Sequence, residues 1–153
     1  MIFFNVFICI ITFFLMEGVA WFTHKYVMHG FLWKVHKDHH VKTTKSFFEN
    51  NDLFFLIFAI PGSLFIIYGS IIGYSQLLFW VGLGITIYGA AYFFVHDLFI
   101  HQRIKVLKNS KNPYLLAIRR GHKVHHKHLG KQDGECFGML LVPYKYFKHY
   151  SKK

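Results

Sequence analysis

The sequence predicts an all-α integral membrane protein, a helical bundle with about three to four transmembrane helices and a histidine-rich helical cap on one side. Of its 153 residues, 54% are hydrophobic and 20% are aromatic, more than soluble domains usually contain. The hydrophobic residues form three long runs, and every Lys and Arg lies outside these runs. Most histidines lie in the segments that flank the runs. By its length the chain is expected to form a single domain over residues 1–153.

The first predicted span covers residues 2–22. This run is long enough to cross a bilayer as a helix, and Glu17 is its only charged residue. It lacks the basic start and the cleavage site of a secretory signal, so we expect it to stay in the mature protein. Glu17 should face the protein interior, because a carboxylate is costly in lipid. It is either a buried group that is protonated or bonded within its helix, or an outer hydrogen-bond partner of His24 on nearly the same helical face.

The second and third predicted spans cover residues 53–74 and 77–95 and are joined by a short uncharged turn. The third span is expected to continue as a helix into water, to about residue 101. Three polar residues precede the second span as candidates for its N-terminal cap, namely Asn50, Asn51 and Asp52. These spans form a hairpin that returns the chain to the side from which it left.

Further elements are predicted after the third span. Asn112 and Pro113 match the N-cap and the first residue of a helix, and Gly130 matches its end. The apolar tail at residues 137–143 is too short to cross a membrane, so it should lie along the interface or pack over the site. The free thiols of Cys9 and Cys136 are not expected to pair in a disulfide.

The distribution of positive charge predicts the orientation. All eighteen Lys and Arg lie in residues 25–45 and 103–153, and the positive-inside rule places such segments in the cytoplasm. We therefore expect cytoplasmic histidine-rich segments at residues 24–45 and 96–153. The formal net charge of +11 could also suit a nucleic-acid-binding protein. A nucleic-acid-binding face would not need to alternate with uncharged stretches of membrane-spanning length, so no nucleic acid is expected as a partner.

The histidines repeat one pattern of spacings in both halves of the chain. His-x4-His followed by His-x2-His-His occurs within residues 24–40, and again in two pieces at residues 96–101 and 122–126. Ten of the twelve histidines belong to this doubled pattern, which predicts a polynuclear metal site built from both halves. The ten candidate ligands are His24, His29, His36, His39, His40, His96, His101, His122, His125 and His126.

The two spacings place different demands on the backbone. The residues of each His-x2-His-His triplet share one face of a helix, and residues 33–41 have enough helical character to carry the first triplet. His24 and His29 are five residues apart and would diverge by about 140° on an ideal α-helix. They converge only if the helix ends or distorts near Gly30, or else they bind different metals.

Ten imidazoles exceed the three or four ligands of a zinc site and would serve two metals of five- or sixfold coordination. Imidazole suits iron, zinc, copper or nickel, so the ligand type leaves the metal open. Three carboxylates are candidates for outer partners of these ligands, namely Glu17, Asp38 and Asp97. Asp97 lies four residues before His101, the spacing at which a carboxylate can hold an imidazole N–H.

These motifs resemble the histidine boxes of the fatty acid hydroxylase superfamily of membrane non-haem di-iron enzymes. The strings HKYVMHGFLWKVHKDHH, FVHDLFIHQR and GHKVHHKHLGKQDGECFGMLLVP are most similar to its bacterial β-carotene 3-hydroxylase branch, over roughly residues 15–145. The resemblance implies a monooxygenase with two iron ions and O2 as cosubstrate, in which zinc can replace iron on purification. The implied reaction is hydroxylation of the β-ionone rings of β-carotene at C3, giving β-cryptoxanthin and zeaxanthin. The implied location is the bacterial inner membrane, with the site on the cytoplasmic side and the carotenoid dissolved among membrane lipids.

Activation of O2 needs two electrons per turnover, which another protein must supply. The sequence has no dinucleotide-binding fingerprint, no cysteine cluster and no obvious haem or flavin module. The basic cytoplasmic face would attract an acidic donor such as reduced ferredoxin, although the same charges would also serve to orient the helices. A homo-oligomer is compatible with the sequence.

Two other functions remain open at this point. One is a different lipid oxidation of the same superfamily, on a sterol, a fatty acyl chain or, as a ketolase-like step, the carotenoid ring. The other is a non-enzymatic membrane metal carrier, which should place its ligands within the spans near the bilayer midplane. The expected ligands instead lie at helix ends on one side, and this favours an enzyme.

Overall fold

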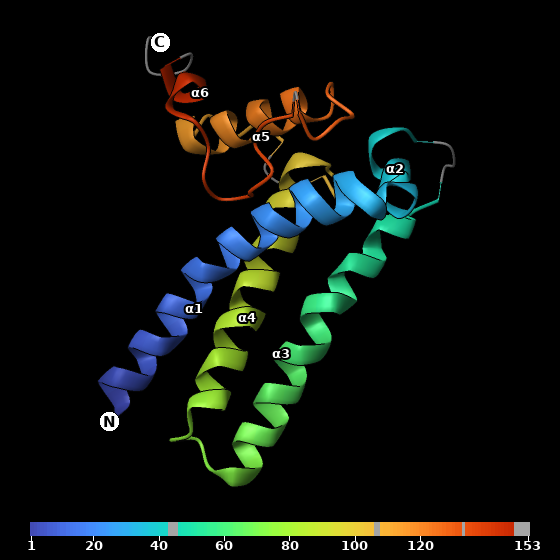
Figure 1. The fold of residues 1–153 in the computed structure, drawn as a ribbon. Coiled ribbons are helices and arrows are strands. Elements are labelled where there is room, and N and C mark those ends of the chain that lie inside the picture. Colours follow the sequence, from blue (N-terminus) through green and yellow to red (C-terminus); the bar gives the residue numbers. More distant parts are fainter. Residues whose placement is uncertain (43–45, 106–107, 133, 149–153) are drawn as a thin grey trace.

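Three long helices lie beneath a cap of shorter elements in the computed structural model of the protein (Figure 1). It describes residues 1–42, 46–105, 108–132 and 134–148. All regular elements within these ranges are helical, which confirms the predicted fold class. The helices long and apolar enough to cross a membrane are Ile2–Phe31, Asn50–Ile72 and Leu77–Ile100. The prediction allowed a fourth span, which the described residues do not contain.

The first span is one long helix with a change of pitch. Helix α1 (Ile2–Phe22) continues directly into a π-helical segment, η1 (Thr23–Phe31). Gly30 leaves helical geometry with φ −106° and ψ −122°, which confirms the predicted distortion at this residue. The chain then turns into α2 (Trp33–His40).

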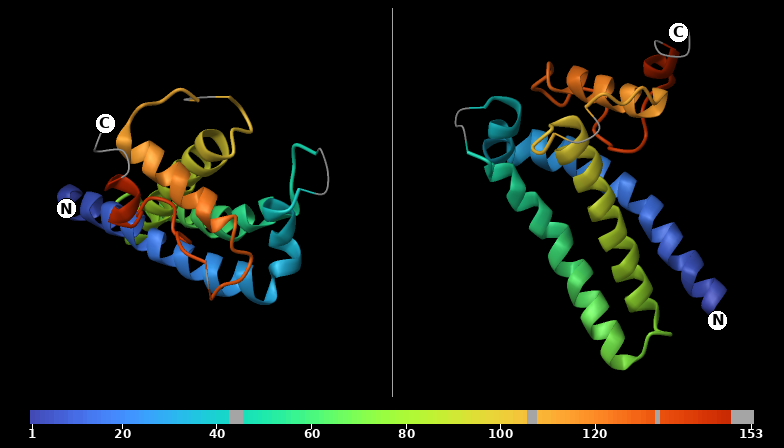
Figure 2. Two further views of the ribbon diagram at one scale, coloured as in Figure 1. Left: turned by 90° about the horizontal axis from the view of Figure 1, so that it is seen from above. Right: turned by 180° about the vertical axis from the view of Figure 1, so that it is seen from behind.

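The second and third spans form the expected hairpin. A short 3-10 turn, η2 (Asn50–Asp52), leads into α3 (Leu53–Ile72), and Gly73 at φ 122° begins the turn into α4 (Leu77–Tyr92). Helix α4 continues into a second π-helical segment, η3 (Phe93–Ile100). The cap is completed by α5 (Pro113–His125) and α6 (Tyr144–Lys148), which lie over the ends of the spans (Figure 2).

Glycines let α4 pack closely against both of its neighbours, α1 and α3. A Cβ atom at Gly84 would lie 2.7 Å from the carbonyl oxygen of Cys9 in α1. A Cβ atom at Gly82 would lie 2.8 Å from the carbonyl oxygen of Gly62 in α3. Membrane helices gain little from hydrophobic burial against each other in lipid, so small residues that permit close backbone approach stabilise their packing.

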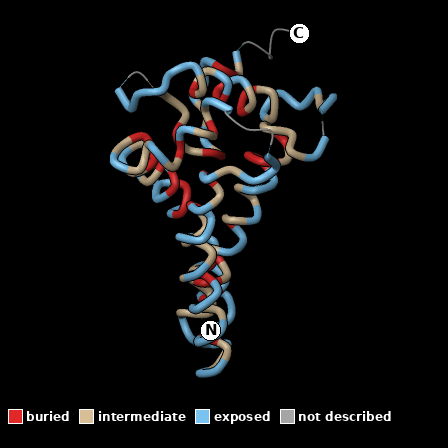
Figure 3. Tube along the Cα trace, turned by 90° about the vertical axis from the view of Figure 1, so that its right-hand side faces the viewer, coloured by how far each residue is buried: buried red, intermediate tan, exposed pale blue. Residues whose placement is uncertain are grey.

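Burial is concentrated at the cap end of the molecule. Figure 3 shows mostly exposed and half-buried residues along the spans, and more buried ones where the spans meet the cap. Large apolar side chains such as Phe3, Ile71 and Phe14 are exposed on the spans, as expected for surfaces that face lipid. A small apolar cluster of Val95, Ile118 and Met139 joins η3, α5 and the tail.

Two local details follow the sequence predictions and one does not. The Asn112 side chain accepts hydrogen bonds from the backbone N–H groups of Tyr114 and Leu115, so the predicted N-cap of α5 is confirmed. Cys9 and Cys136 are both free thiols, as expected. Helix α5 ends at His125 rather than at Gly130, because the Leu129 carbonyl beyond it accepts from the His29 ring and not from a helical N–H group.

Candidate metal centre

Both His-x4-His pairs are positioned by π-helical segments: His24 and His29 lie within η1, and His96 lies within η3 with His101 directly after it. At the end of η1 the Leu32 N–H bonds to the Val27 carbonyl, and at the end of η3 the His101 N–H bonds to the His96 carbonyl, each at a spacing of five residues. A π-helical turn brings residues i and i+5 together, so the divergence expected on an α-helix does not occur. The ring centroids of His24 and His29 are 5.1 Å apart, and those of His96 and His101 are 4.5 Å apart.

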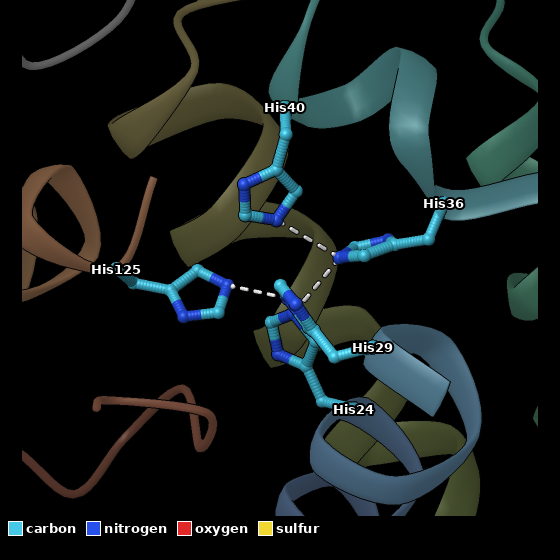
Figure 4. Close-up of side chains that lie close together, drawn as sticks. All are labelled: His24, His29, His36, His40 and His125. Carbon is cyan, nitrogen blue, oxygen red and sulfur yellow. Dashed lines mark hydrogen bonds between the residues drawn. The ribbon is translucent and has the colours of Figure 1, made fainter. Parts of the chain in front are cut away.

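Nine of the ten predicted ligands converge in two groups. Within each group, one ring nitrogen of every residue lies within 4.8 Å of the others. The first histidine group is His24, His29, His36, His40 and His125 (Figure 4). The second histidine group is His39, His96, His101 and His122. Each group therefore takes ligands from both halves of the chain, as the doubled pattern predicts.

The His-x2-His-His triplets are divided between the groups, although each shares one helical face. His36 and His40 belong to the first group while His39 belongs to the second, and His125 and His122 are divided in the same way. The tenth histidine, His126, belongs to neither group. Its Nε2 lies 2.8 Å from Nε2 of His122, and its ring stacks on His40 with centroids 4.2 Å apart. His126 therefore lies between the two groups.

The outer ring nitrogens are held by hydrogen-bond acceptors. In the first group, the Nδ1–H groups of His24, His29 and His125 donate to backbone carbonyls at 2.9, 3.0 and 3.1 Å. The acceptors are the carbonyls of Phe137, Leu129 and Glu135. A carbonyl oxygen can only accept, so each of these imidazoles carries its proton on Nδ1 and turns the Nε2 lone pair inward.

The Nε2 atoms that face inward lie close together, and in the neutral rings they carry no proton. Nε2 of His24 is 3.1 Å from Nε2 of His36, and Nε2 of His29 is 3.2 Å from Nε2 of His125. Figure 4 marks these approaches with dashed lines. A hydrogen bond there would need one protonated imidazolium ring. Burial opposes this, since it lowers the pKa of His36 to about 3 and also lowers that of His125.

The second group shows the same electrostatic pattern. Burial, together with the neighbouring imidazoles, holds the pKa values of His39 and His122 well below the usual range. Nε2 of His96 lies 3.0 Å from that of His39, and Nε2 of His101 lies 2.9 Å from that of His122. Neutral imidazoles with converging lone pairs are a donor set for a transition-metal cation. The residues present in both groups therefore fit a metal ion.

Comparison with known proteins agrees with this donor set. The sequence profile described as fatty acid hydroxylase matches residues 9–146. The chain belongs to the fatty acid hydroxylase family. It is 40% identical to a beta-carotene hydroxylase of Pantoea ananas over 91% of this chain and 78% of that protein. It is 38% identical to a beta-carotene hydroxylase of Pseudescherichia vulneris over 90% of this chain and 77% of that protein.

A plant relative shares the same core. The chain is 39% identical to beta-carotene hydroxylase 2, chloroplastic, of Capsicum annuum over 84% of this chain and 41% of that longer protein. No solved structure matches the chain. The matched residues 9–146 include all ten patterned histidines, so the two histidine groups lie within the hydroxylase family match.

The three carboxylates predicted as outer partners have different roles in this hydroxylase. Asp97 Oδ2 lies 3.3 Å from Nδ1 of His96, so the predicted partner, His101, is wrong. The spacing argument assumed an α-helix, and the π-helical backbone turns Asp97 elsewhere. Asp38 accepts a hydrogen bond from the backbone N–H of Asn50 at 2.5 Å. Asp38 thereby fixes the segment that carries the partners of His36 and His39.

Glu17 binds the tail of the hydroxylase. Its Oε1 accepts hydrogen bonds from three successive backbone N–H groups, at 2.8, 2.8 and 2.9 Å, and its Oε2 accepts one from the Tyr88 hydroxyl at 2.6 Å. The three N–H groups belong to residues 139–141. In the part of the chain that the structure describes, no hydrogen bond joins Glu17 to His24. The partnership with His24 considered from the sequence is therefore wrong.

Sequence reasoning missed three residues around the ligands. Asn51 Oδ1 accepts the His36 Nδ1–H at 2.6 Å, and Glu49 Oε2 accepts the His39 Nδ1–H at 2.8 Å. Arg103 joins Glu49 to Asp97, with N–O distances of 3.2 and 3.0 Å. The sequence indicates Asn51 only as a cap candidate. The available signal was a run of polar residues beside an apolar span, close in sequence to the first triplet.

The apolar tail covers the first histidine group, which confirms one of its two predicted positions. The Phe137 ring lies with its centroid 5.5, 5.3 and 5.0 Å from those of His24, His29 and His125. Phe137 and Met139 are each 2% exposed. Since Phe137 also supplies the carbonyl that holds His24, the tail both orients a histidine of the first group and shields the group from water.

Proposed function

We propose that this protein is an O2-dependent β-carotene hydroxylase. Its reaction is hydroxylation of the β-ionone rings at C3, which gives β-cryptoxanthin and then zeaxanthin. The observation that carries this proposal is the similarity to beta-carotene hydroxylases over about nine tenths of the chain. The converging neutral imidazoles at one end of three apolar spans support a metal enzyme with a lipid-soluble substrate, and they do not suit a carrier with ligands near the midplane.

The proposed cofactors are two iron ions, one in each histidine group. Bound there, iron would supply the activation of O2, with one oxygen atom inserted into a ring C–H bond, the other released as water, and two electrons and two protons drawn from outside. The protein orients the imidazoles through outer acceptors such as Asn51 and Glu49. Phe137 and Phe54 pack against histidine rings of the first group and exclude water there.

The electron donor is proposed to be an acidic protein such as reduced ferredoxin, and it docks on the cap. Lysines are exposed on α2, on α5 and just beyond each helix, interleaved with the histidine triplets. They are Lys34, Lys37, Lys42, Lys123 and Lys127. Such a basic face speeds encounter with an acidic partner. The positive-inside rule supports the cytoplasm as the side of the cap and, for a bacterial cell, the inner membrane as the location.

Expression in a bacterial host that accumulates β-carotene tests the reaction. The wild-type protein should yield β-cryptoxanthin and zeaxanthin whose hydroxyl oxygen derives from labelled O2. His36→Ala should abolish the products. The matched control His128→Ala should retain them, since His128 is exposed and outside both groups. A wild-type protein that leaves β-carotene unchanged but oxidises a sterol or a fatty acyl lipid would refute the carotenoid assignment.

Metal content tests the two-ion centre separately from the substrate. Protein purified in mild detergent should hold about two transition-metal ions per chain, with iron in the active form. His36→Ala alters only the first group and His122→Ala only the second, so each should lower the content toward one ion. A wild-type content near one ion that neither variant changes would contradict the proposal.

A further inference from the structure

A pocket of about 650 Å³ lies between α1 and the tail segment 136–143. Its wall on α1 includes Phe14, Gly18 and Trp21, and its wall on the tail includes Phe137, Leu141 and Pro143. The volume falls in the range of small-molecule sites, which are mostly apolar and few per protein. One of the lining residues, Phe137, also packs against histidine rings of the first group.

The lining of the pocket suits a largely apolar ligand. Its one acidic side chain, Glu17, is occupied by three backbone N–H groups and the Tyr88 hydroxyl. The Cys136 thiol also lines the pocket, and burial raises its pKa to about 11, which keeps it neutral. The nearby Lys25 ammonium lies 5.2 Å from the Trp21 ring and 5.7 Å from the Phe137 ring, so its charge is directed at aromatic walls. An apolar ring would gain from leaving water or lipid for these walls.

The pocket joins the membrane surface of the protein to the candidate metal centre. Its α1 residues belong to the first span, and its rim is apolar and open, with Phe14 67% and Leu141 74% exposed. Phe137 lines the pocket as well, and its buried ring packs against three histidines of the first group. A molecule that enters from lipid therefore reaches a residue that directly contacts this group.

Gly18 leaves part of this space empty. A Cβ atom at Gly18 would meet no atom within 4 Å, although the residue lines the pocket. A larger side chain at this position would therefore extend into the pocket without displacing backbone. Gly89 on α4 also has no atom within 4 Å of a Cβ position and is not part of the pocket lining, so it offers a matched control.

We propose that this pocket receives the terminal ring of the carotenoid, while the polyene extends along α1 into the bilayer. Phe137 is then the side chain that separates the ring from the first histidine group and must shift for a ring carbon to reach it. The inference rests on the proposed function, because it takes a carotenoid ring as the occupant. It assigns substrate positioning to Gly18 and Trp21, which lie three residues apart on one face of α1.

A size series at Gly18 tests the pocket. Gly18→Ala, Gly18→Leu and Gly18→Phe, each paired with the same change at Gly89, are compared for β-carotene turnover and metal content. Turnover should fall with side-chain size at Gly18, on the order of tenfold or more for Gly18→Phe, because a misfit of one methylene in an apolar pocket already costs about tenfold and the benzyl group is much larger. The Gly89 series should stay near wild type. Metal content should not change in either series, and Trp21→Ala added to Gly18→Phe should restore part of the activity by returning space.

Each outcome decides between the two proposals. A wild-type protein that does not oxidise β-carotene refutes the proposed function. An active wild type with an equally active Gly18→Phe variant overturns the pocket alone. Equal losses in the Gly18 and Gly89 series would also overturn it, because they would reflect bulk on a span and not a filled site. Loss of metal from Gly18→Phe would overturn it as well, since the side chain would then act on the ligands.

Discussion

Replacing Asn51 by Leu removes the acceptor of His36 while keeping a side chain of similar size. The Asn51 oxygen lies 2.6 Å from the His36 Nδ1 atom, and His36 is 1% exposed, so water cannot take its place. An unsatisfied buried donor costs about 1–3 kcal/mol. The loss of an outer partner of a metal-bound histidine weakens metal binding about 10–100-fold. A factor of ten corresponds to about 1.4 kcal/mol, so the two estimates agree.

The assay for Asn51→Leu is competition between the purified protein and a chelator of known affinity. The first histidine group should release its ion at about 10–100-fold lower chelator concentration, while the second group keeps its own. Asn51→Asp preserves the acceptor and should bind metal at least as well as wild type. Asn50→Leu changes the exposed neighbour on the same turn and controls for the general effect of an apolar side chain on this turn. Equal metal affinity of Asn51→Leu and Asn50→Leu would refute the assigned role of Asn51.

Three further results are expected. The pKa of His36 is lowered from 6.5 to about 3, so the unfolded chain binds more protons than the folded chain between these two pH values. The metal-free fold should therefore lose about 1.4 kcal/mol of stability per pH unit from His36 alone as the pH falls below 6.5. Denaturation in detergent at pH 7 and pH 5 checks this, and equal stability at both would contradict it. Gly84→Leu places a side chain against the Cys9 carbonyl and should lower the melting temperature by several degrees. The control Gly89→Leu should leave the melting temperature unchanged. Equal melting temperatures of the two variants would argue against close packing of α1 and α4. A cysteine at Ser75 should react only from the outer side and one at Ser110 only from the cytoplasm, and reaction of both from one side would contradict the hairpin.

The spans could be predicted from the sequence because length and hydrophobicity alone determine them. The runs 2–22, 53–74 and 77–95 correspond to helices α1, α3 and α4. The even number of crossings then required the two histidine segments to lie on one side. The structure brings nine of the ten candidate ligands into two groups, so the inference from repeated spacing to convergence is confirmed.

The backbone geometry at the ligands could not be predicted in the same way. An α-helical reading separates His24 from His29, and it assigns Asp97 to His101. The π-helical segments make both expectations wrong. No residue type in the sequence marks where hydrogen bonding changes from i+4 to i+5. Gly30 marked the end of the first segment, but the chain has no comparable glycine near His101.

The partners of Glu17 and His36 depended on contacts distant in sequence. Glu17 lies 122 residues from Met139, to which it is hydrogen-bonded, and periodicity within a helix carries no information about such a partner. Asn51 is a suitable residue type for a helix cap, and this local role gives no sign of its hydrogen bond to His36. When a local role already accounts for a polar residue, the sequence does not indicate a second, distant partner.

Each histidine group takes residues from both halves of the chain, so the geometry of both groups depends on how the two halves pack together. The first histidine group takes four ligands from residues 24–40 and one, His125, from α5, while the second takes His39 from α2 and three from the later half. Neither group can bind a metal with its full set unless α2 and α5 face each other across the ends of the spans. Among the described residues, the hairpin core 53–92 supplies no ligand to either group, yet it carries η3 and the close contacts of α4 with α1 and α3. The packing of the spans therefore sets the distance between the two sets of histidines, and a substitution in the membrane that shifts α4 should alter both histidine groups at once.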